Sequence, residues 1–265
     1  MNDIVRLALE EDIGSGDITT DSCVPADRQA CGLFLAREPL ILAGTEVLPQ
    51  LFSGLTLQKH DGDRCDAGEI LAAVTGPARL LLTRERVSLN FLQRLSGVAT
   101  LARRFVDGVA GTNCRVLDTR KTTPGFRALE KAAAAAGGVT NHRMGLYDAI
   151  LIKNNHISAA GGVREAIERT RAASSLPIEI EVRTRAEMRE ALASGAAHLL
   201  LDNLSPFEAA DWIREIGGRA KVELSGGITL ETVRDYAETG ADYISAGAIT
   251  HSARAVDISF RLELL

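Results

Sequence analysis

The sequence predicts an α/β protein with two domains, an irregular N-terminal α+β domain over residues 1–110 and a barrel-like domain over residues 111–265. Three observations carry this prediction. After residue 111, short apolar segments alternate with amphipathic ones. The last four apolar segments begin at intervals of about 20 residues, and polar residues follow nearly every one of them. Short, continuously apolar strands are typical of a parallel sheet with helices on both faces.

The first 110 residues predict a small sheet with flanking helices. The segment IVRLALEEDIG has the spacing of an amphipathic helix, whereas ACGLFLAREPLILAG and LTLQKH are strand-like. Glycines and alternating apolar residues in DGDRCDAGEILAAVTGP indicate hairpins. A long helical pattern then runs from Leu80 to Ala110, in which Gly97 indicates a break or a close helix contact.

The second domain predicts strands at CRVLDT, DAILIK, PIEIEV, HLLLDN, KVELSG and DYISAG. Helical patterns follow most of them, at GFRALEKAAAAAGG, GGVREAIERTRAAS, TRAEMREALASGA, SPFEAADWIREIGG and ITLETVRDYAETGA. A closed barrel and a doubly wound open sheet both fit this alternation. The polar strand ends favour the barrel, because a barrel gathers all of its strand ends at one rim, whereas an open sheet gathers them only near its switch point.

The composition excludes several classes of partner. The formal net charge is -5, which argues against binding to nucleic acid or to an anionic membrane. No apolar run is long enough to span a bilayer, and the N-terminus lacks the basic start and apolar core of a signal peptide. We therefore expect a cytoplasmic protein.

A group of cations follows the predicted strands. Arg120 and Lys121 come directly after the strand VLD, Lys153 follows DAILI, and the segment VTNHR contributes His142 and Arg143. Any one of these could be a solvated strand end, but together they would repel one another unless an anion lay between them. Arginine matches the geometry of carboxylate or phosphate, so the cluster predicts a ligand with more than one anionic group.

Two further features accompany the cations. Glu181 and Asp202 end the next two strands and suit Mg²⁺, sugar hydroxyls or a developing positive charge. The last two strands end in the small residues Ser225–Gly227 and Ala246–Ala248, and the first of these loops is expected to lead straight into a helix. Backbone N–H groups in such loops bind phosphate.

These motifs resemble those of the quinolinate phosphoribosyltransferase family. The resemblance rests on LNFLQRLSGVAT, LDTRKTTPGFRALEK, GGVTNHRMGLYDAILIKNNHI, IEIEV, LLLDN, ELSGGI and DYISAGAIT, and it extends from EEDIGSGDITTD to AVDISFRL. It implies an N-terminal α/β sandwich, an incomplete barrel of about seven strands and a C-terminal tail that packs on the N-terminal domain. It also implies the conversion of quinolinate and phosphoribosyl diphosphate into nicotinate mononucleotide, diphosphate and CO₂ with Mg²⁺, in a homodimer or larger homo-oligomer with shared sites.

The resemblance also implies roles for individual residues. Arg120, His142, Arg143 and Lys153 would hold the quinolinate carboxylates, and Arg86 would reach into the site of the partner subunit. Lys121 would contact phosphoribosyl diphosphate, and Glu181 and Asp202 would serve the ribose and, directly or through substrate, Mg²⁺. Lys121, Lys153, Glu181 and Asp202 would be catalytic. The remaining substrate contacts would be Thr119, Ser225, Gly226, Gly227, Ser245, Ala246, Gly247 and Ala248.

Three departures from the family pattern affect loops rather than charged contacts, at Ala132, Val139 and Asn154. Alternatives stay open at this point. One is a paralogue of the same fold associated with molybdate-transport genes, although the intact TRK, NHR and LIK motifs favour the quinolinate enzyme. A phosphate-binding barrel isomerase or decarboxylase would not need four cations at the rim, and a non-catalytic phosphosugar-binding regulator would not need Glu181 together with Asp202.

Overall fold

The computed structural model describes residues 3–265, whose contacts divide them into two units. Unit 2 comprises Arg104–Lys121 and Val139–Ala248. Unit 1 comprises the preceding residues, Thr122–Gly138 and Ile249–Leu265, so both units are discontinuous, whereas the sequence suggested one division at residue 110. The segment Thr122–Gly138 joins unit 1 because its end packs closely on the long helix, where a Cβ at Gly137 would lie 2.4 Å from the carbonyl oxygen of Ala99.

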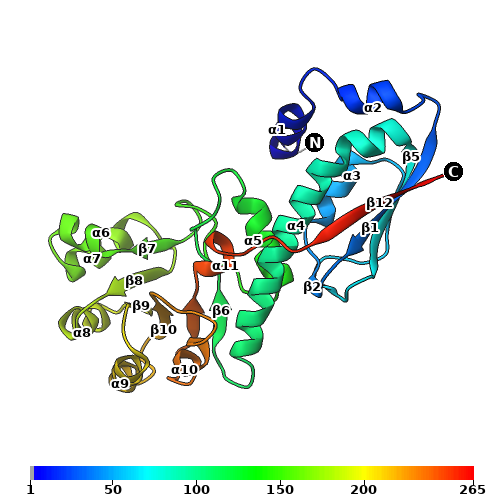
Figure 1. The fold of residues 1–265 in the computed structure, drawn as a ribbon. Helices are drawn as coiled ribbons and strands as arrows, with labels where there is room; N and C mark the ends of the chain where they lie inside the picture. The colour runs from blue at the N-terminus through cyan, green and yellow to red at the C-terminus, as the bar shows by residue number, and fades with distance from the viewer. Residues whose placement is uncertain (1–2) are drawn as a thin grey trace. The chain divides into compact units, whose positions relative to one another are not determined.

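Unit 1 is built on an antiparallel sheet with the order β12-β1-β5-β3, in which the last strand of the chain pairs with the first (Figure 1). Phe34 lies opposite Phe260 in the register, and their rings meet edge to face with centroids 4.9 Å apart. Gly32 makes this packing possible, since a Cβ there would lie 2.0 Å from the Phe260 ring. The strands of this unit are β1 (Gln29–Ala36), β2 (Leu40–Ile41), β3 (Leu55–Leu57), β4 (Arg64–Cys65), β5 (Ile70–Pro77) and β12 (Ile258–Leu264).

The helices of unit 1 include α4 (Ala78–Gly108), which continues into unit 2. Gly97 does not break this helix. The backbone at Arg254 approaches so closely that a Cβ at Gly97 would lie 2.0 Å from its carbonyl oxygen, which explains the glycine. The other helices are α1 (Asp3–Ile13), α2 (Ile18–Cys23), η1 (Thr45–Val47), α3 (Leu48–Leu51), α5 (Arg127–Ala136) and α11 (Ala248–His251).

Unit 2 contains a parallel sheet with the order β6-β11-β10-β9-β8-β7. Thr140 adds a parallel bridge to Leu117 on the outer side of β6, and no pairing joins Thr140 to β7 within residues 3–265. The predicted fold class, an incomplete barrel after a small N-terminal α/β domain, is therefore confirmed. The strands are β6 (Arg115–Leu117), β7 (Ile150–Ile152), β8 (Ile178–Val182), β9 (His198–Asp202), β10 (Lys221–Ser225) and β11 (Tyr243–Ser245).

Helices follow the strands of unit 2 and are fixed by local capping. Thr184 and Ser205 form capping boxes with Glu187 and Glu208, which satisfy backbone N–H groups at the starts of α8 and α9. Among the described residues, no helix is both long and apolar enough to cross a membrane. The helices are α6 (Asn154–Ala160), α7 (Val163–Ala173), α8 (Arg185–Ala193), α9 (Pro206–Ile216) and α10 (Val233–Ala237).

Candidate active site

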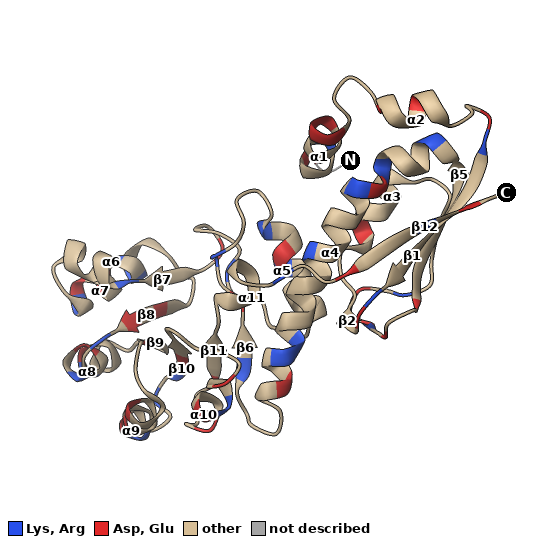
Figure 2. Ribbon diagram, viewed as in Figure 1, with Lys and Arg blue, Asp and Glu red and all other residues tan. Residues whose placement is uncertain are grey.

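The carboxyl ends of the parallel strands bring most of the predicted site residues to one rim of unit 2. Successive residues of a strand face opposite sides, so one face of β8 carries apolar residues toward the helices and the other carries Glu179 and Glu181 into the barrel. Acidic residues on β8 are drawn red in Figure 2. Predicted residues that end or follow these strands are Thr119, Arg120, Lys121, Lys153, Glu181, Asp202, Ser225, Ser245 and Ala246.

Three cations at this rim have no acidic partner. Arg120, Arg143 and Lys153 form no ion pair with any residue between 3 and 265, and the Nε atom of Arg120 is buried without a hydrogen-bond acceptor. Burial lowers the pKa of Arg143, and the nearby charge of Arg120 lowers it further. Two guanidinium groups near each other, neither in an ion pair with a described carboxylate, form a site for an anion.

Asp118 ties the segment after β6 to the segment that carries Arg143. Its fully buried carboxylate accepts hydrogen bonds from the backbone N–H of His142 at 2.8 Å and from the side-chain amide of Asn141 at 2.6 Å. A buried carboxylate is costly unless it is bonded in this way. Asp118 was not among the residues predicted from the sequence, although an Asp at the end of an apolar run was a usable signal.

The imidazole of His142 has a protein partner on each nitrogen. The backbone N–H of Arg143 donates to Nδ1 at 2.8 Å, and Nε2 lies 2.9 Å from an oxygen of Glu179. Glu223 lies near the same nitrogen at 3.6 Å. The imidazole therefore lies above a pair of carboxyl groups that belong to β8 and β10.

The pKa values of the two carboxyl groups near His142 are shifted in opposite directions. Burial, followed by the neighbouring carboxylate of Glu179, raises the pKa of Glu223 well above its ordinary value. Burial also opposes ionisation of Glu179, but its hydrogen bond with His142 and the nearby imidazole of His198 leave its pKa lower than usual. Burial lowers the pKa of His198. The protonated form is therefore favoured more at Glu223 than at Glu179. Neither glutamate was predicted from the sequence as a site residue.

Glu181 and Asp202 share a cation supplied by the chain. Arg183 lies 3.0 Å from Glu181 and 3.7 Å from Asp202. The other oxygen of Asp202 accepts a hydrogen bond from Ser225 at 2.7 Å. Two carboxylates close enough to face one guanidinium form an oxygen donor set of the kind that binds Mg²⁺, so these residues fit the predicted metal.

The loop after β10 is close-packed and turns sharply. Gly226 and Gly227 have positive φ angles, and Asn203, after β9, has a φ of 59°. A Cβ at Gly226 would lie 2.2 Å from the side-chain oxygen of Asn203. The prediction that this loop leads straight into a helix is wrong, since α10 begins only at Val233 after a turn. It is the loop at Ala246 and Gly247 that leads directly into a helix, the short α11.

Arg86 lies apart from this group in the chain. It is exposed on α4 in unit 1, and it forms no ion pair in the part of the chain that the structure describes.

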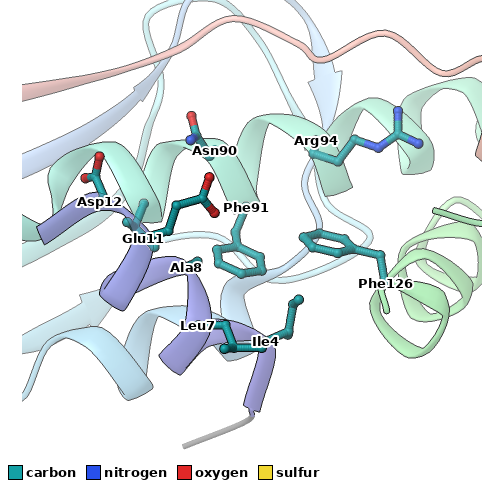
Figure 3. A pocket seen from close by; sticks show the side chains of 10 residues that line it. Ile4, Leu7, Ala8, Glu11, Asp12, Asn90, Phe91, Arg94 and Phe126 are labelled. Atoms are coloured by element: carbon teal, nitrogen blue, oxygen red, sulfur yellow. The ribbon is translucent and has the colours of Figure 1, made fainter. Parts of the chain in front are cut away.

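A hollow of about 440 Å³ lies in unit 1, between α1, α4 and the segment before α5 (Figure 3). Phe91 and Phe126 stack in it with ring centroids 5.4 Å apart. Arg94 at its edge is paired with the buried Glu130 at 2.6 Å. None of the predicted site residues lines this hollow, and its one cation is already neutralised.

Comparisons with known proteins identify the family. Residues 17–96 match the N-terminal domain model of quinolinate phosphoribosyl transferase, and residues 98–261 match its C-terminal domain model. The chain is 41% identical over 273 residues to the carboxylating nicotinate-nucleotide pyrophosphorylase of Mycobacterium leprae, covering 98% of this chain and 96% of that protein. It is 39% identical to a decarboxylating quinolinate phosphoribosyltransferase of Nicotiana tabacum, covering 98% of this chain and 81% of that protein.

A solved structure is also similar to this chain. The nicotinate-nucleotide pyrophosphorylase of Ehrlichia chaffeensis superimposes with a TM-score of 0.95 at 37% identity, over 98% of both chains. The similarity therefore spans both units.

Proposed function

This chain belongs to the quinolinate phosphoribosyltransferase family, and we propose here which of its residues perform that family's reaction. The enzyme is a decarboxylating pentosyltransferase of de novo NAD biosynthesis. It transfers the phosphoribosyl group of phosphoribosyl diphosphate to quinolinate and releases diphosphate and CO₂, which leaves nicotinate mononucleotide.

The observation that carries the residue assignment is the group of cations without acidic partners. Quinolinate has two carboxylates beside a ring nitrogen, and Arg120, Arg143 and Lys153 offer two planar forks and one point charge to receive them. Placing these carboxylates here removes the repulsion between Arg120 and Arg143 that lowers the pKa of Arg143. Bound in this way, the ring is held with its nitrogen free to react.

Phosphoribosyl diphosphate would occupy the neighbouring part of the rim. Lys121, which is exposed after β6, is proposed to contact its phosphates, with Thr119 beside it. The small residues after the last two strands allow close approach of backbone N–H groups to the 5′-phosphate. This phosphate side comprises Ser225, Gly226, Gly227, Ser245, Ala246, Gly247 and Ala248.

Mg²⁺ is the metal proposed for the acidic end of the site. Glu181 and Asp202 would hold it, directly or through the substrate, after Arg183 gives up its contacts with them. When bound, the metal neutralises the charge that develops on the departing diphosphate.

The chain's own residues account for the remaining chemistry. Arg120, Arg143 and Lys153 orient quinolinate so that its nitrogen attacks the anomeric carbon as the bond to diphosphate breaks. Glu181 and Asp202, near the ribose, stabilise the positive charge that develops on the sugar. The ring nitrogen is then quaternary, and its positive charge stabilises the electron pair left on the adjacent carbon when the carboxylate departs as CO₂. A proton then replaces that carboxylate, and no organic cofactor is required.

We also propose that the active enzyme is a homodimer or larger homo-oligomer in the cytoplasm, with Arg86 of one subunit completing the site of another. The support is the exposure of Arg86 and its lack of an acidic partner in the described chain. Such an arginine can serve an anion outside its own unit.

A mass-spectrometric assay for nicotinate mononucleotide from quinolinate and phosphoribosyl diphosphate tests the activity. Binding measurements test the site, because quinolinate should bind far more tightly than nicotinate, which lacks one carboxylate. No product and equal binding of the two acids would instead favour a paralogue with another substrate.

A further inference from the structure

The hydrogen bonds of His142 indicate which ring nitrogen carries the proton. The backbone N–H of Arg143 points at Nδ1 from 2.8 Å, so Nδ1 must offer a lone pair rather than a proton. The ring proton then lies on Nε2, where it is donated to Glu179 at 2.9 Å. His142 is therefore neutral, and no ring N–H remains for a substrate carboxylate.

A metal ion does not explain the same cluster. Ligand atoms of His142, Glu179 and Glu223 lie within 4.8 Å of one another, which is close enough for a shared ion. A metal on Nε2 would leave the ring without any proton, because Nδ1 already accepts a hydrogen bond. Histidine ligands ordinarily donate their second nitrogen instead. A hydrogen bond from Nε2 to Glu179 fits both nitrogens.

The bonds around His142 fix the peptide that carries Arg143. Asp118 accepts the backbone N–H of His142, and Glu179 holds its ring from the opposite side. Glu179 is only 6% exposed, and ligand atoms of Glu179, Glu223 and His142 lie within 4.8 Å of one another. The imidazole thus connects the buried interior of β8 to the Arg143 peptide, and the Arg143 guanidinium donates to the backbone carbonyl of Ala149 at 3.2 Å.

We propose that Glu179 is a positioning residue for quinolinate, acting through a neutral His142 that does not itself contact the substrate. This replaces the direct role expected for His142 from the sequence. The inference rests on the proposed function, because it takes Arg143 as a ligand of quinolinate. The two can be tested separately, since the proposed function fails if the wild-type enzyme does not bind quinolinate.

The kinetic test compares Glu179→Leu with Glu179→Gln. Leucine removes the acceptor for Nε2–H, and we expect it to raise the KM for quinolinate about tenfold or more, because a small misplacement of a binding group has effects of this order. The turnover number and the KM for phosphoribosyl diphosphate should change less than about threefold. Glutamine keeps a side-chain oxygen that can accept from Nε2–H of His142, so its KM should stay within about threefold of wild type. Glu208→Gln, which removes a charge at a helix cap, is the matched control.

Three kinetic outcomes overturn the proposal in enzymes that keep the wild-type melting temperature. They are an unchanged quinolinate KM in Glu179→Leu, equal damage in Glu179→Gln, and equal weakening of both substrates.

A second measurement needs no variant. In enzyme labelled with ¹⁵N-histidine, His142 should show the neutral Nε2–H tautomer both free and with quinolinate bound. Conversion to the doubly protonated form on binding would mean that the ring contacts a carboxylate, and the proposal would fail.

Discussion

Two lysines of unit 2, one at the amino end of a parallel strand and one just after the carboxyl end of another, differ in their partners. Lys221 begins β10 with its ammonium 2.6 Å from Asp242, and the hydrogen bond to that carboxylate raises its pKa. Lys153 follows β7 and forms no ion pair with any described residue. Both are exposed, so exposure does not distinguish them. A cation paired within the chain therefore serves the fold, whereas a cation without an ion-pair partner is available to a ligand.

Arg86→Ala gives the strongest test of this distinction, because Arg86 also forms no ion pair with a residue that the structure describes. We expect kcat/KM to fall by about 100-fold or more, since a charge-assisted contact to a substrate carboxylate is lost. Circular dichroism should show an intact fold, because the side chain is exposed.

Mixing Arg86→Ala with the inactive Lys153→Met variant extends that test to the shared site. After subunit exchange, some mixed sites would combine an intact Arg86 from one chain with an intact Lys153 from the other, and activity should return. If exchange is demonstrated but activity never exceeds that of the separate variants, Arg86 does not act across subunits.

Lys153→Met and Lys221→Met form a matched pair for the comparison itself. Lys153→Met should weaken quinolinate binding roughly 10- to 150-fold, which corresponds to the loss of about 1.5–3 kcal/mol, and leave phosphoribosyl diphosphate binding nearly unchanged. Lys221→Met should leave both affinities unchanged. Isothermal titration calorimetry measures both, and a similar loss of quinolinate affinity in the two variants would refute the distinction.

Asp202→Asn tests the acidic side of the rim. The substitution preserves shape and the hydrogen bond with Ser225 but removes the charge that faces Arg183. We expect turnover to fall about tenfold and the response to Mg²⁺ to weaken, with quinolinate binding unchanged or slightly tighter. An unaltered Mg²⁺ titration curve would show that Asp202 is only a strand-end carboxylate.

The smallest effect is expected at a paired cation, Arg254. Its hydrogen bond with Glu38 is the largest cause that lowers the pKa of Glu38 to about 2. Because this pKa is lower in the folded chain, the ionised carboxylate stabilises the fold above pH 4.5 and loses its contribution as pH falls toward 2. Glu38→Gln should therefore lower the free energy of unfolding by less than about 1 kcal/mol at pH 7, given partial exposure, and by less at pH 3.5. Urea unfolding at both pH values checks this. Folded Glu38→Gln should keep the catalytic activity of the wild type at pH 7.

Local signals in the sequence were enough to predict the rim. Apolar runs with abrupt polar ends located β6 to β11, and parallel pairing brings such ends together whatever the details of the sheet. The resemblance added Arg86, whose helical surroundings give no sign of a role. The prediction of roles for these residues stays a prediction.

The layer beneath the rim could not be predicted in the same way. The proximity of Glu179 on β8 to Glu223 on β10 depends on the position of β9 between these strands and on the register of the three strands. No local sequence pattern predicts either. Asp118 and His142 likewise meet only because Thr140 bridges to Leu117. The turn that delays α10 until Val233 was missed because a glycine pair indicates a tight turn without giving its length.

The pairing of β12 with β1 has a consequence for the order in which the chain folds. Ala30 lies opposite Leu264, so this edge of the sheet in unit 1 closes only after nearly the whole chain has been synthesised. Contacts between residues so distant in sequence form slowly, because a long loop must close before they are made. During synthesis on the ribosome, the edge of β1 that pairs with β12 therefore stays unpaired while the strands of unit 2 emerge and pair with their neighbours. A nascent chain stalled before Ile258 should consequently expose that edge to chaperones or to other chains.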